Sequence, residues 1–337
     1  MPELRQNPVT KEWVIIAKER AKRPEDFAHE TPPPENGEKA NCPFCPGHED
    51  KTPPEIMSFR TFDTKPNAPG WWVRVVPNKF GALMLEGKVE RHKEEDFFMV
   101  MDGFGQHEVL IESPDHDANI ATMEQKQVEQ IFLAYRERGQ ALAKDPRFEK
   151  VIIFKNHGAS AGTSLRHPHS QIIAMPITPL HIRHRLEEAM RYFDNSGKCV
   201  YCEMVEKEKK AKSRMVLETD NFAVFEPFAA RSPFETWVMP KAHNSTFAGI
   251  SPELCKELAL VMRRVLIKIY KALKNPDYNY IFYSSPCHEH DLEYYHWHIK
   301  ILPRVSSVAG FELGSGVYIN TVVPEEAARY LRDTSVE

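Results

Sequence analysis

The sequence predicts an α+β fold of two related halves, each an antiparallel sheet with covering helices. The main observation is a repeat of features. A Cys-x-x-Cys pair, a strand that ends near a histidine, a capped helix, a strand, a polar loop and a His-x-His strand occur twice along the 337 residues. Each half has few strands and one long amphipathic helix, so the halves are expected to pack together to bury a core. We place them at residues 1–185 and 186–337.

The composition is that of a globular protein. Hydrophobic residues make up 42% and charged residues 27% of the chain, and a net charge of −4 argues against a nucleic-acid partner. No apolar run approaches the roughly 18 residues of a membrane span, and residues 1–6 lack the apolar stretch of a secretory signal. We therefore expect a cytoplasmic protein that binds no membrane. In that compartment its six cysteines are expected to be thiols or metal ligands.

The strands of the first half are short runs of β-branched and aromatic residues between turn-forming residues. They lie at 13–16, 72–76, 108–112 and 151–154. A helix is expected to begin at Thr122, which forms a capping box with Gln125, and to end at Asp145-Pro146. Residues 28–41 are rich in Pro and Glu, which indicates an extended loop.

The second half shows the same order of elements. Strands are expected at 222–225, 236–239, 280–283 and 296–303. A helix begins at Ser251-Pro252, with proline at its first position, and ends at Asn275-Pro276. In both halves the Cys-x-x-Cys pair is expected to form a tight turn that directs two thiolates toward one point.

Each half contains two cysteines and two histidines at matching places in the repeat. The sets are Cys42, Cys45, His116 and His167, and Cys199, Cys202, His243 and His296. Zinc prefers four such ligands in a tetrahedron. The spacing differs from that of a zinc finger, so the ligands would come from separate elements, and we expect one or two structural zinc ions per chain. The alternative is that the thiols are incidental and the imidazoles bind backbone carbonyls.

The stretch from His167 to Gln171 contains the strongest catalytic candidates. Alternate residues of a strand share a face, so His167, His169 and Gln171 can point to the same side. If a metal holds His167, His169 is left as an imidazole that can attack phosphorus and leave again. Gln171, Ser164 and the amides of residues 161–163 are placed to hydrogen-bond a phosphoryl oxygen. A core histidine is the alternative for His169.

Two more polar groups bear on where a phosphate would bind. Arg20 and Arg23 lie near the end of the first strand and suit phosphate oxygens, although by residue type a solvated basic turn is the more common explanation. In the second half Lys300 stands where Gln171 stands in the first. We therefore do not expect His298 to be a second nucleophile.

Together these residues resemble the galactose-1-phosphate uridylyltransferase family, a branch of the histidine-triad superfamily. The branch signature His-Pro-His-(Gly/Ser)-Gln is matched by residues 167–171. Other matching segments extend along nearly the whole chain, at 7–10, 20–24, 42–45, 78–80, 113–116, 156–166 and 240–243. The resemblance implies two histidine-triad-like halves, and a homodimer in which the partner contributes sugar contacts.

The resemblance also implies roles for single residues. His169 matches the residue that carries the nucleotidyl group. The other matches are substrate contacts: Gln171, Ser164 and Asn156 for phosphate and nucleotide, Arg20 and Arg23 for phosphate, Asn78 and Phe80 for the nucleoside, and Phe311 for the sugar.

Two departures from the family pattern concern specificity. The best-known members carry Asn-Asp-Phe in the nucleoside pocket, and Lys79 replaces that aspartate here. Their sugar-contact segment contains a Glu and a Gln with which residues 311–320 do not align cleanly. The segment and the Cys199/Cys202 pair are closer to the subgroup that includes plant ADP-glucose phosphorylase-like proteins and some prokaryotic uridylyltransferases.

We therefore expect a nucleotidyltransferase that exchanges UMP between UDP-glucose and galactose 1-phosphate by a ping-pong mechanism. His169 would attack the α-phosphorus, release glucose 1-phosphate and pass UMP to the hexose 1-phosphate, without magnesium or a redox cofactor. The nearest alternative is an ADP-glucose phosphorylase-type transfer of an adenylyl group to phosphate. A histidine-triad nucleotide hydrolase, in which histidine usually replaces Gln171, and a zinc-stabilised binding module are further alternatives.

Overall fold

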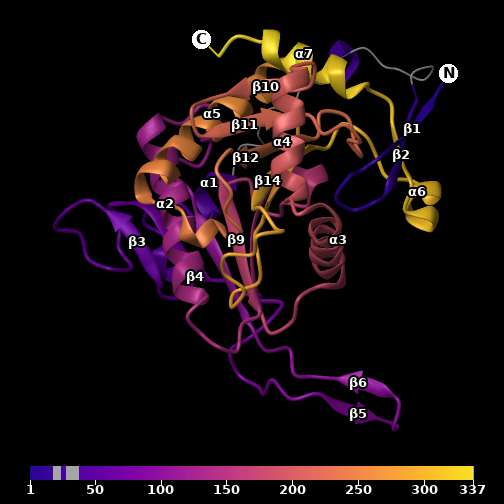
Figure 1. Cartoon of the computed structure of the whole chain (residues 1–337). Coiled ribbons are helices and arrows are strands. Elements are labelled where there is room, and N and C mark those ends of the chain that lie inside the picture. Colours follow the sequence, from indigo (N-terminus) through magenta and orange to yellow (C-terminus); the bar gives the residue numbers. More distant parts are fainter. Residues whose placement is uncertain (18–23, 28–37, 337) are drawn as a thin grey trace.

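One ten-stranded antiparallel sheet runs through both halves of the chain (Figure 1). The structure is a computed structural model that describes residues 1–17, 24–27 and 38–336. From one edge to the other the strands are β10 (Met215–Glu218), β11 (Phe222–Phe225), β12 (Thr236–Pro240), β14 (His298–Pro303), β13 (Tyr278–Tyr283), β8 (Lys150–His157), β9 (His169–Met175), β7 (Gln106–Ile111), β4 (Trp71–Pro77) and β3 (Met57–Arg60).

The two halves join edge to edge at β8 and β13. These strands are antiparallel neighbours, and Asn279 lies opposite Asn156 in their register. Outward from this joint the order is β8-β9-β7-β4-β3 in one half and β13-β14-β12-β11-β10 in the other, so the two five-strand units correspond strand by strand. The predicted α+β class with two repeats is confirmed. The division at residues 185/186 stays a proposal, and it falls within helix α3 (Leu180–Ser196).

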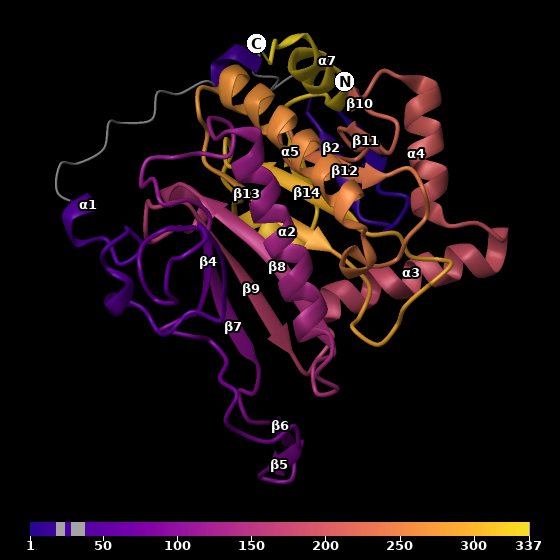
Figure 2. The same ribbon diagram turned by 90° about the vertical axis from the view of Figure 1, so that its left-hand side faces the viewer.

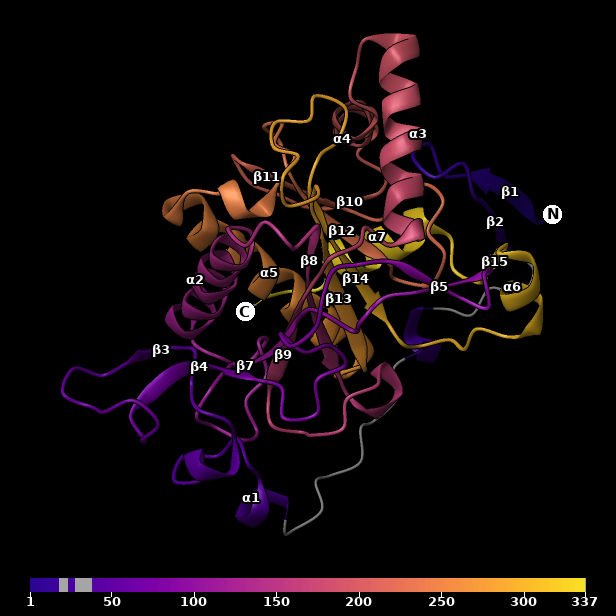
Figure 3. The ribbon, with the colours of Figure 1, turned by 90° about the horizontal axis from the view of Figure 1, so that it is seen from below.

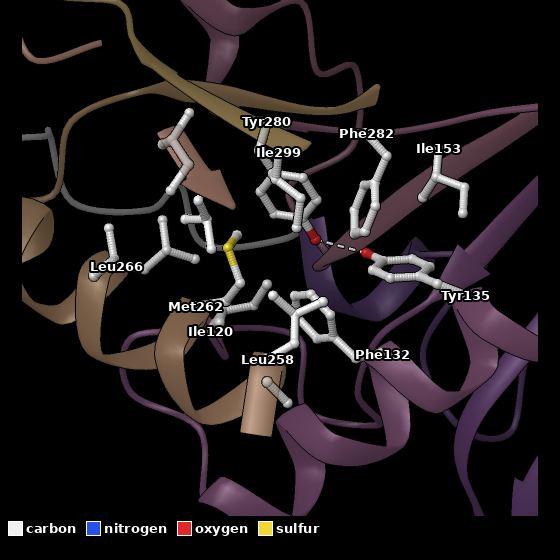
Figure 4. Close-up of a cluster of buried hydrophobic side chains, with 14 of the residues drawn as sticks. Ile120, Phe132, Tyr135, Ile153, Leu258, Met262, Leu266, Tyr280, Phe282 and Ile299 are labelled. Atoms are coloured by element: carbon white, nitrogen blue, oxygen red, sulfur yellow. Dashed lines mark hydrogen bonds between the residues drawn. The ribbon is translucent and has the colours of Figure 1, made fainter. Parts of the chain in front are cut away.

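Two long helices cover one face of the sheet. They are α2 (Gln125–Leu142) and α5 (Pro252–Leu273), one from each half, and they pack against each other in front of the strands (Figure 2). Their apolar stripes form the main core with the sheet, where Phe132 and Met262 are fully buried (Figure 4). Complete burial of one such side chain contributes about 1.5–3 kcal/mol to folding. The core therefore holds the two halves together as one body.

The opposite face is covered unequally. In the second half, α3 and α4 (Val200–Ala211) pack over Trp237 and its apolar neighbours. Figure 3 shows α3 on the side of the sheet away from α2 and α5. In the first half, the turn at residues 42–45 that follows α1 (Glu38–Asn41) packs against β4 and β7.

Smaller elements lie around this body. A three-stranded sheet joins β1 (Glu3–Gln6), β2 (Trp13–Ile16) and β15 (Tyr318–Asn320). The hairpin of β5 (His92–Glu94) and β6 (Phe98–Val100) projects away from the body (Figure 1). The remaining elements are the helices α6 (Gly310–Ser315) and α7 (Pro324–Asp333) and short 3₁₀ turns at Pro24–Phe27, Glu49–Lys51, Ala159–Ala161 and Phe247–Gly249. No helix among the described residues has both the length and the apolar character needed to cross a membrane.

The helix starts were predicted with mixed success. Helix α5 begins as predicted, because the Ser251 side chain accepts a hydrogen bond from the Leu254 amide at 3.2 Å. Helix α2 begins at Gln125, and the predicted capping box at Thr122 is wrong. The Thr122 hydroxyl instead donates to the Asn119 carbonyl at 3.0 Å, within a turn that precedes the helix. A side chain held in that turn cannot cap the first helical amides.

The second Cys-x-x-Cys pair also differs from the prediction. Cys42 and Cys45 lie in a turn, as expected, but Cys199 is the N-cap of α4 and Cys202 lies in its first turn. The sequences explain the difference. Prolines follow Cys42 and Cys45 and prevent a regular helix there, whereas residues 200–211 are rich in Glu and Lys, which favour one.

Candidate active site and metal sites

The first residue of strand β9 is His169, whose imidazole lies at the edge of a large cavity. Its Nδ1 atom lies 2.8 Å from the main-chain oxygen of His167. A carbonyl oxygen only accepts hydrogen bonds, so Nδ1 carries the proton and Nε2 keeps its lone pair. Burial lowers the pKa of His169 below the usual value for histidine, which favours the neutral ring. This arrangement suits a nucleophile.

The cavity has a volume of about 910 Å³ and is lined by both halves of the chain. His169, Ser164 and Asn156, all predicted site residues, line it together. The second half contributes polar and charged side chains at Asn275, Asp277 and Arg304. The cavity is large enough for a nucleotide-sized ligand.

The loop after strand β8 forms one wall of the cavity and is fastened to the second half. The carboxylate of Asp277 accepts hydrogen bonds from the amide and the hydroxyl of Ser160, at 2.7 and 2.6 Å. Gly158 has a φ of +85°, and a Cβ atom at this position would overlap the Asp277 carboxylate. Only glycine therefore allows this close approach.

A chain of hydrogen bonds from the second half orients the amide of Asn156. The Asn279 Nδ2 atom donates to Asn156 Oδ1 at 2.7 Å, and Arg304 Nε donates to Asn279 Oδ1 at 2.6 Å. Asn279 also donates to the Ala161 carbonyl at 2.9 Å. Because Oδ1 of Asn156 is occupied, its Nδ2 group is the one left to donate to a ligand.

Three other predicted substrate residues, Gln171, Asn78 and Phe80, lie outside the cavity lining. Gln171 follows His169 by two positions on β9, and its Oε1 atom lies 2.7 Å from His107 Nε2. Asn78 Nδ2 lies 3.2 Å from the same nitrogen, and Asn78 Oδ1 accepts from the amide of the exposed Phe80.

The predicted sugar contact does not join this group. Phe311 is half-exposed on α6, and it does not line the cavity that contains His169. Arg20 and Arg23 lie outside the described residues.

The sequence did not indicate two buried charged residues next to strand β9, Lys155 and Glu112. Lys155 Nζ donates to Glu112 Oε2 at 2.6 Å and to the main-chain oxygen of His169 at 3.1 Å. Only 2% of Lys155 and 0% of Glu112 is exposed. In the sequence each of them is only a polar residue within an apolar strand, a pattern that is common at solvent-facing strand positions and so does not indicate a buried pair. His107, a polar residue of β7, was not predicted as a site residue for the same reason.

The first set of predicted metal ligands converges. Cys42, Cys45, His116 and His167 are all buried, and their ligand atoms lie within 4.8 Å of one another. Cys45 Sγ lies 3.4 Å from His116 Nδ1 and 3.5 Å from His167 Nδ1. His167 Nε2 donates to the Ser113 carbonyl at 2.7 Å, so the lone pair of Nδ1 faces the sulfur atoms.

The second set converges as well, in a more exposed position. Cys202 Sγ lies 3.2 Å from His243 Nδ1 and 3.3 Å from His296 Nδ1, and Cys199 completes the group. His243 Nε2 donates to the Leu292 carbonyl at 3.0 Å, which again leaves Nδ1 facing sulfur. Two sulfur and two nitrogen donors match the ligand preference of zinc in both clusters.

The second half has no open counterpart of the His169 site. His298 occupies the matching position on β14, but its ring is stacked between Trp237, at 4.6 Å, and Tyr283, at 5.0 Å between ring centroids. His298 is fully buried. The Lys300 ammonium lies over the same two rings. A substrate cannot approach this imidazole, in agreement with the expectation that His298 is not a second nucleophile.

Comparisons with known proteins agree along the whole chain. The family model described as "Galactose-1-phosphate uridyl transferase, N-terminal domain" matches residues 1–179, and the model of its C-terminal domain matches residues 185–336. The chain is 39% identical to an ADP-glucose phosphorylase of Arabidopsis thaliana, over 99% of the chain and 93% of the relative. It is 33% identical to a galactose-1-phosphate uridylyltransferase of Thermotoga maritima, over all of both proteins.

Solved structures give the same result. A crystal structure of an Arabidopsis thaliana ADP-glucose phosphorylase with bound ADP-glucose superposes with a TM-score of 0.82 and 36% identity, and covers 99% of this chain and 100% of that one. A structure described as a uridylyltransferase gives a TM-score of 0.76 at 26% identity, over 99% of this chain and 98% of that one.

Proposed function

The chain belongs to the galactose-1-phosphate uridyl transferase family of nucleotidyltransferases, and from this premise we propose that it transfers the adenylyl group of ADP-glucose to inorganic phosphate through a covalent intermediate on His169. The observation that carries the chemistry is the neutral His169 imidazole, which keeps its Nε2 lone pair at the cavity edge. The choice of substrate rests on the 39% identical relative and on the ADP-glucose bound in a similar structure.

The proposed reaction has two steps at phosphorus. His169 Nε2 attacks the α-phosphorus of ADP-glucose, a nitrogen–phosphorus bond forms, and the bond to the bridging oxygen breaks, which releases glucose 1-phosphate. An oxygen of inorganic phosphate then attacks the adenylyl-histidine, which releases ADP and restores the imidazole. The negative charge on the transferring group is stabilised by donors around it, namely the Asn156 amide, the Ser164 hydroxyl and the Gln171 amide.

The second candidate is the exchange of UMP between UDP-glucose and galactose 1-phosphate. It uses the same histidine, and the 33% identical relative supports it. In this case the uridylyl group passes from His169 to a hexose 1-phosphate in place of inorganic phosphate. We expect this activity to be the weaker one, because the more similar relative carries the phosphorylase name.

We further propose that the first cysteine–histidine cluster holds a structural zinc ion, and that the second holds another. Zinc would fix the turn at Cys42 and Cys45 to His116 and to His167, which precedes strand β9. It would supply structural support, since all four positions of a tetrahedron are filled by protein. The homodimer implied by family resemblance also stays a proposal.

The first test is the intact mass of the protein after mixing with ADP-glucose, and separately with UDP-glucose, in the absence of an acceptor. A gain equal to one adenylyl group, absent in His169→Ala, is the expected result. A uridylyl adduct alone would select the second candidate. Release of free nucleotide without an adduct would favour a hydrolase and contradict both proposals.

The acceptor is tested in a second experiment on the isolated adduct. Adding inorganic phosphate is expected to release ADP and return the mass to that of the free protein. Galactose 1-phosphate is the matched acceptor, and faster discharge by it than by phosphate would contradict the proposed phosphorylase.

A further inference from the structure

His107 is the residue through which Gln171 and the loop at 78–82 are joined. It is the second residue of β7, and the register between β7 and β9 places Val109 opposite Gln171. His107 and Val109 are two positions apart, so the His107 side chain lies on the same face of the sheet as Gln171 and His169. It therefore lies beside the proposed reaction site, although it does not line the cavity.

Two contacts determine which nitrogen of His107 carries the proton. The Ala82 amide donates a hydrogen bond to His107 Nδ1 at 3.2 Å. A backbone N–H can only donate, so Nδ1 must be the unprotonated nitrogen and Nε2 must carry the proton. The Nε2–H group then donates to Gln171 Oε1, at 2.7 Å.

This hydrogen bond decides which end of the Gln171 amide is available. An unrestrained glutamine can present either its oxygen or its NH₂ group, and the oxygen would repel a phosphoryl oxygen. Because His107 occupies Oε1, the NH₂ group is left, and no described residue accepts a hydrogen bond from it. A donor is therefore fixed on the face that carries His169.

The loop that precedes β7 in sequence is held by the same residue. The Asn78 amide donates to the His107 carbonyl at 2.8 Å, and the Ala82 amide donates to the His107 ring. Asn78 Nδ2 lies 3.2 Å from Nε2 of the ring, but both groups carry protons in this tautomer, so this contact is not a hydrogen bond. The main chain and the ring of His107 thus hold the loop at 78–82, and the ring also holds the proposed phosphoryl donor Gln171.

We propose that His107 is a positioning residue for nucleotidyl transfer, which fixes Gln171 so that its NH₂ group faces the transferring phosphoryl group. The inference rests on the proposed function of His169 and Gln171. His107 acts through Gln171 and does not itself contact the phosphoryl group. Its contribution to the rate should therefore vanish when Gln171 can no longer donate.

The test is a double-mutant cycle read by the rate of adduct formation on His169 in single-turnover experiments with ADP-glucose. His107→Phe keeps an aromatic ring but removes the donor, and it is expected to slow adduct formation by roughly 10- to 100-fold. Gln171→Met is expected to slow it to a similar extent. In the Gln171→Met background, His107→Phe should change the rate by less than about twofold, because the two residues act as one unit.

A rescue variant separates positioning from folding. His107→Gln offers an amide donor at about the reach of Nε2 and a carbonyl that can accept from Ala82, and it is expected to retain most of the wild-type rate. His107→Asn is too short to reach Gln171 and should behave like His107→Phe. If His107→Phe fails to fold, the cycle is run with His107→Asn. Melting temperatures near the wild-type value would show that the rate losses are local.

The outcomes distinguish this inference from the proposed function. If the wild-type protein forms the adduct and His107→Phe forms it equally fast, the role of His107 is wrong and the proposed function stands. If the rate losses of His107→Phe and Gln171→Met add up in the double variant, the role of His107 is also wrong, because the two residues then act independently. If the wild-type protein forms no adduct, the proposed function fails and the inference fails with it.

Discussion

The Nδ1 atom of His169 lies 2.8 Å from the main-chain oxygen of His167, a residue whose own side chain belongs to the first cysteine–histidine cluster. The carbonyl that sets the tautomer of the proposed nucleophile is therefore carried by a proposed metal ligand. Because the Ser113 carbonyl also accepts from His167 Nε2, the His167 ring is held in one orientation. Metal binding and reactivity should be coupled in the first half.

Loss of the first metal site should reduce both stability and activity. In Cys42→Ser we expect zinc content to fall by one ion per chain, with a lower melting temperature and slower formation of the adduct on His169. Cys199→Ser is the matched control. It should also lose one ion, but the adduct should form at nearly the wild-type rate, because His298 beside that cluster is enclosed by Trp237 and Tyr283.

Metal content by atomic emission and the single-turnover rate decide this prediction. A Cys42→Ser protein that keeps both its metal and its melting temperature would contradict the proposed first zinc site. Equal effects of the two substitutions on the adduct rate would contradict the coupling through His167.

The buried pair of Glu112 and Lys155 should be sensitive to the loss of one partner. Replacing Lys155 by Met leaves the Glu112 carboxylate buried without its cation, and it removes the donor to the His169 carbonyl. We expect a loss of about 3–5 kcal/mol in the free energy of unfolding, measured by urea denaturation. The double variant Lys155→Met/Glu112→Gln should recover most of that loss, because the unpaired charge is gone. A single variant as stable as the wild type would show that the pair is not important for stability.

The sequence was sufficient to predict the repeat, most central strands and the convergence of the two cysteine–histidine clusters. Strand β11 has the predicted bounds of 222–225, and β4, β7 and β8 contain most of the residues expected in them. The short edge strands β3 and β10 were missed, because four residues of mixed polarity give too weak an alternation. Helix α4 stands where a turn was expected, because a Cys-x-x-Cys pair is compatible with a turn and with the first turn of a helix.

The site was harder to predict where it depends on residues far apart in the chain. The edge-to-edge joint brings Asn279 to Asn156, and nothing in either local sequence indicates that register. His107 likewise lies in a short strand of mixed polar and apolar residues. Its tautomer is set by the Ala82 amide, which only the fold of the loop at 78–82 brings to the ring. Local patterns indicate the chemistry of a side chain, whereas its hydrogen-bond partner follows from tertiary packing.

The contact between the halves leads to a prediction for Asn279. In Asn279→Asp the new carboxylate can still accept from Arg304, so the fold should be retained. It can no longer donate to Asn156 Oδ1 or to the Ala161 carbonyl. The Asn156 amide is then expected to rotate, donate to the carboxylate and present its oxygen to the ligand.

We expect kcat/KM for ADP-glucose phosphorolysis to fall by about 100-fold, the lower end of the effect of removing one oriented donor from a site. Asn279→Ser is the comparison, because it removes the donor to Asn156 without adding a charge, and its loss should be smaller. Unchanged kcat/KM in Asn279→Asp would show that the second half does not orient Asn156 for function.

The last prediction concerns Gly158, at the point where the cavity loop meets Asp277. Alanine at this position would place its Cβ atom against the Asp277 carboxylate, and it would also have to adopt a φ near +85°. The loop must then move away, and the two hydrogen bonds from Ser160 to Asp277 must lengthen or break. We expect a loss of about 1–3 kcal/mol in stability together with weaker binding of the nucleotide sugar.

Gly197→Ala is the matched control, because Gly197 also has a positive φ, of +66°, but has no atom near its Cβ position. This control should lose stability through backbone strain alone and should keep its affinity, measured by calorimetry with ADP-glucose. If both variants bind ADP-glucose equally well, the fastening of this loop by Asp277 does not shape the binding site.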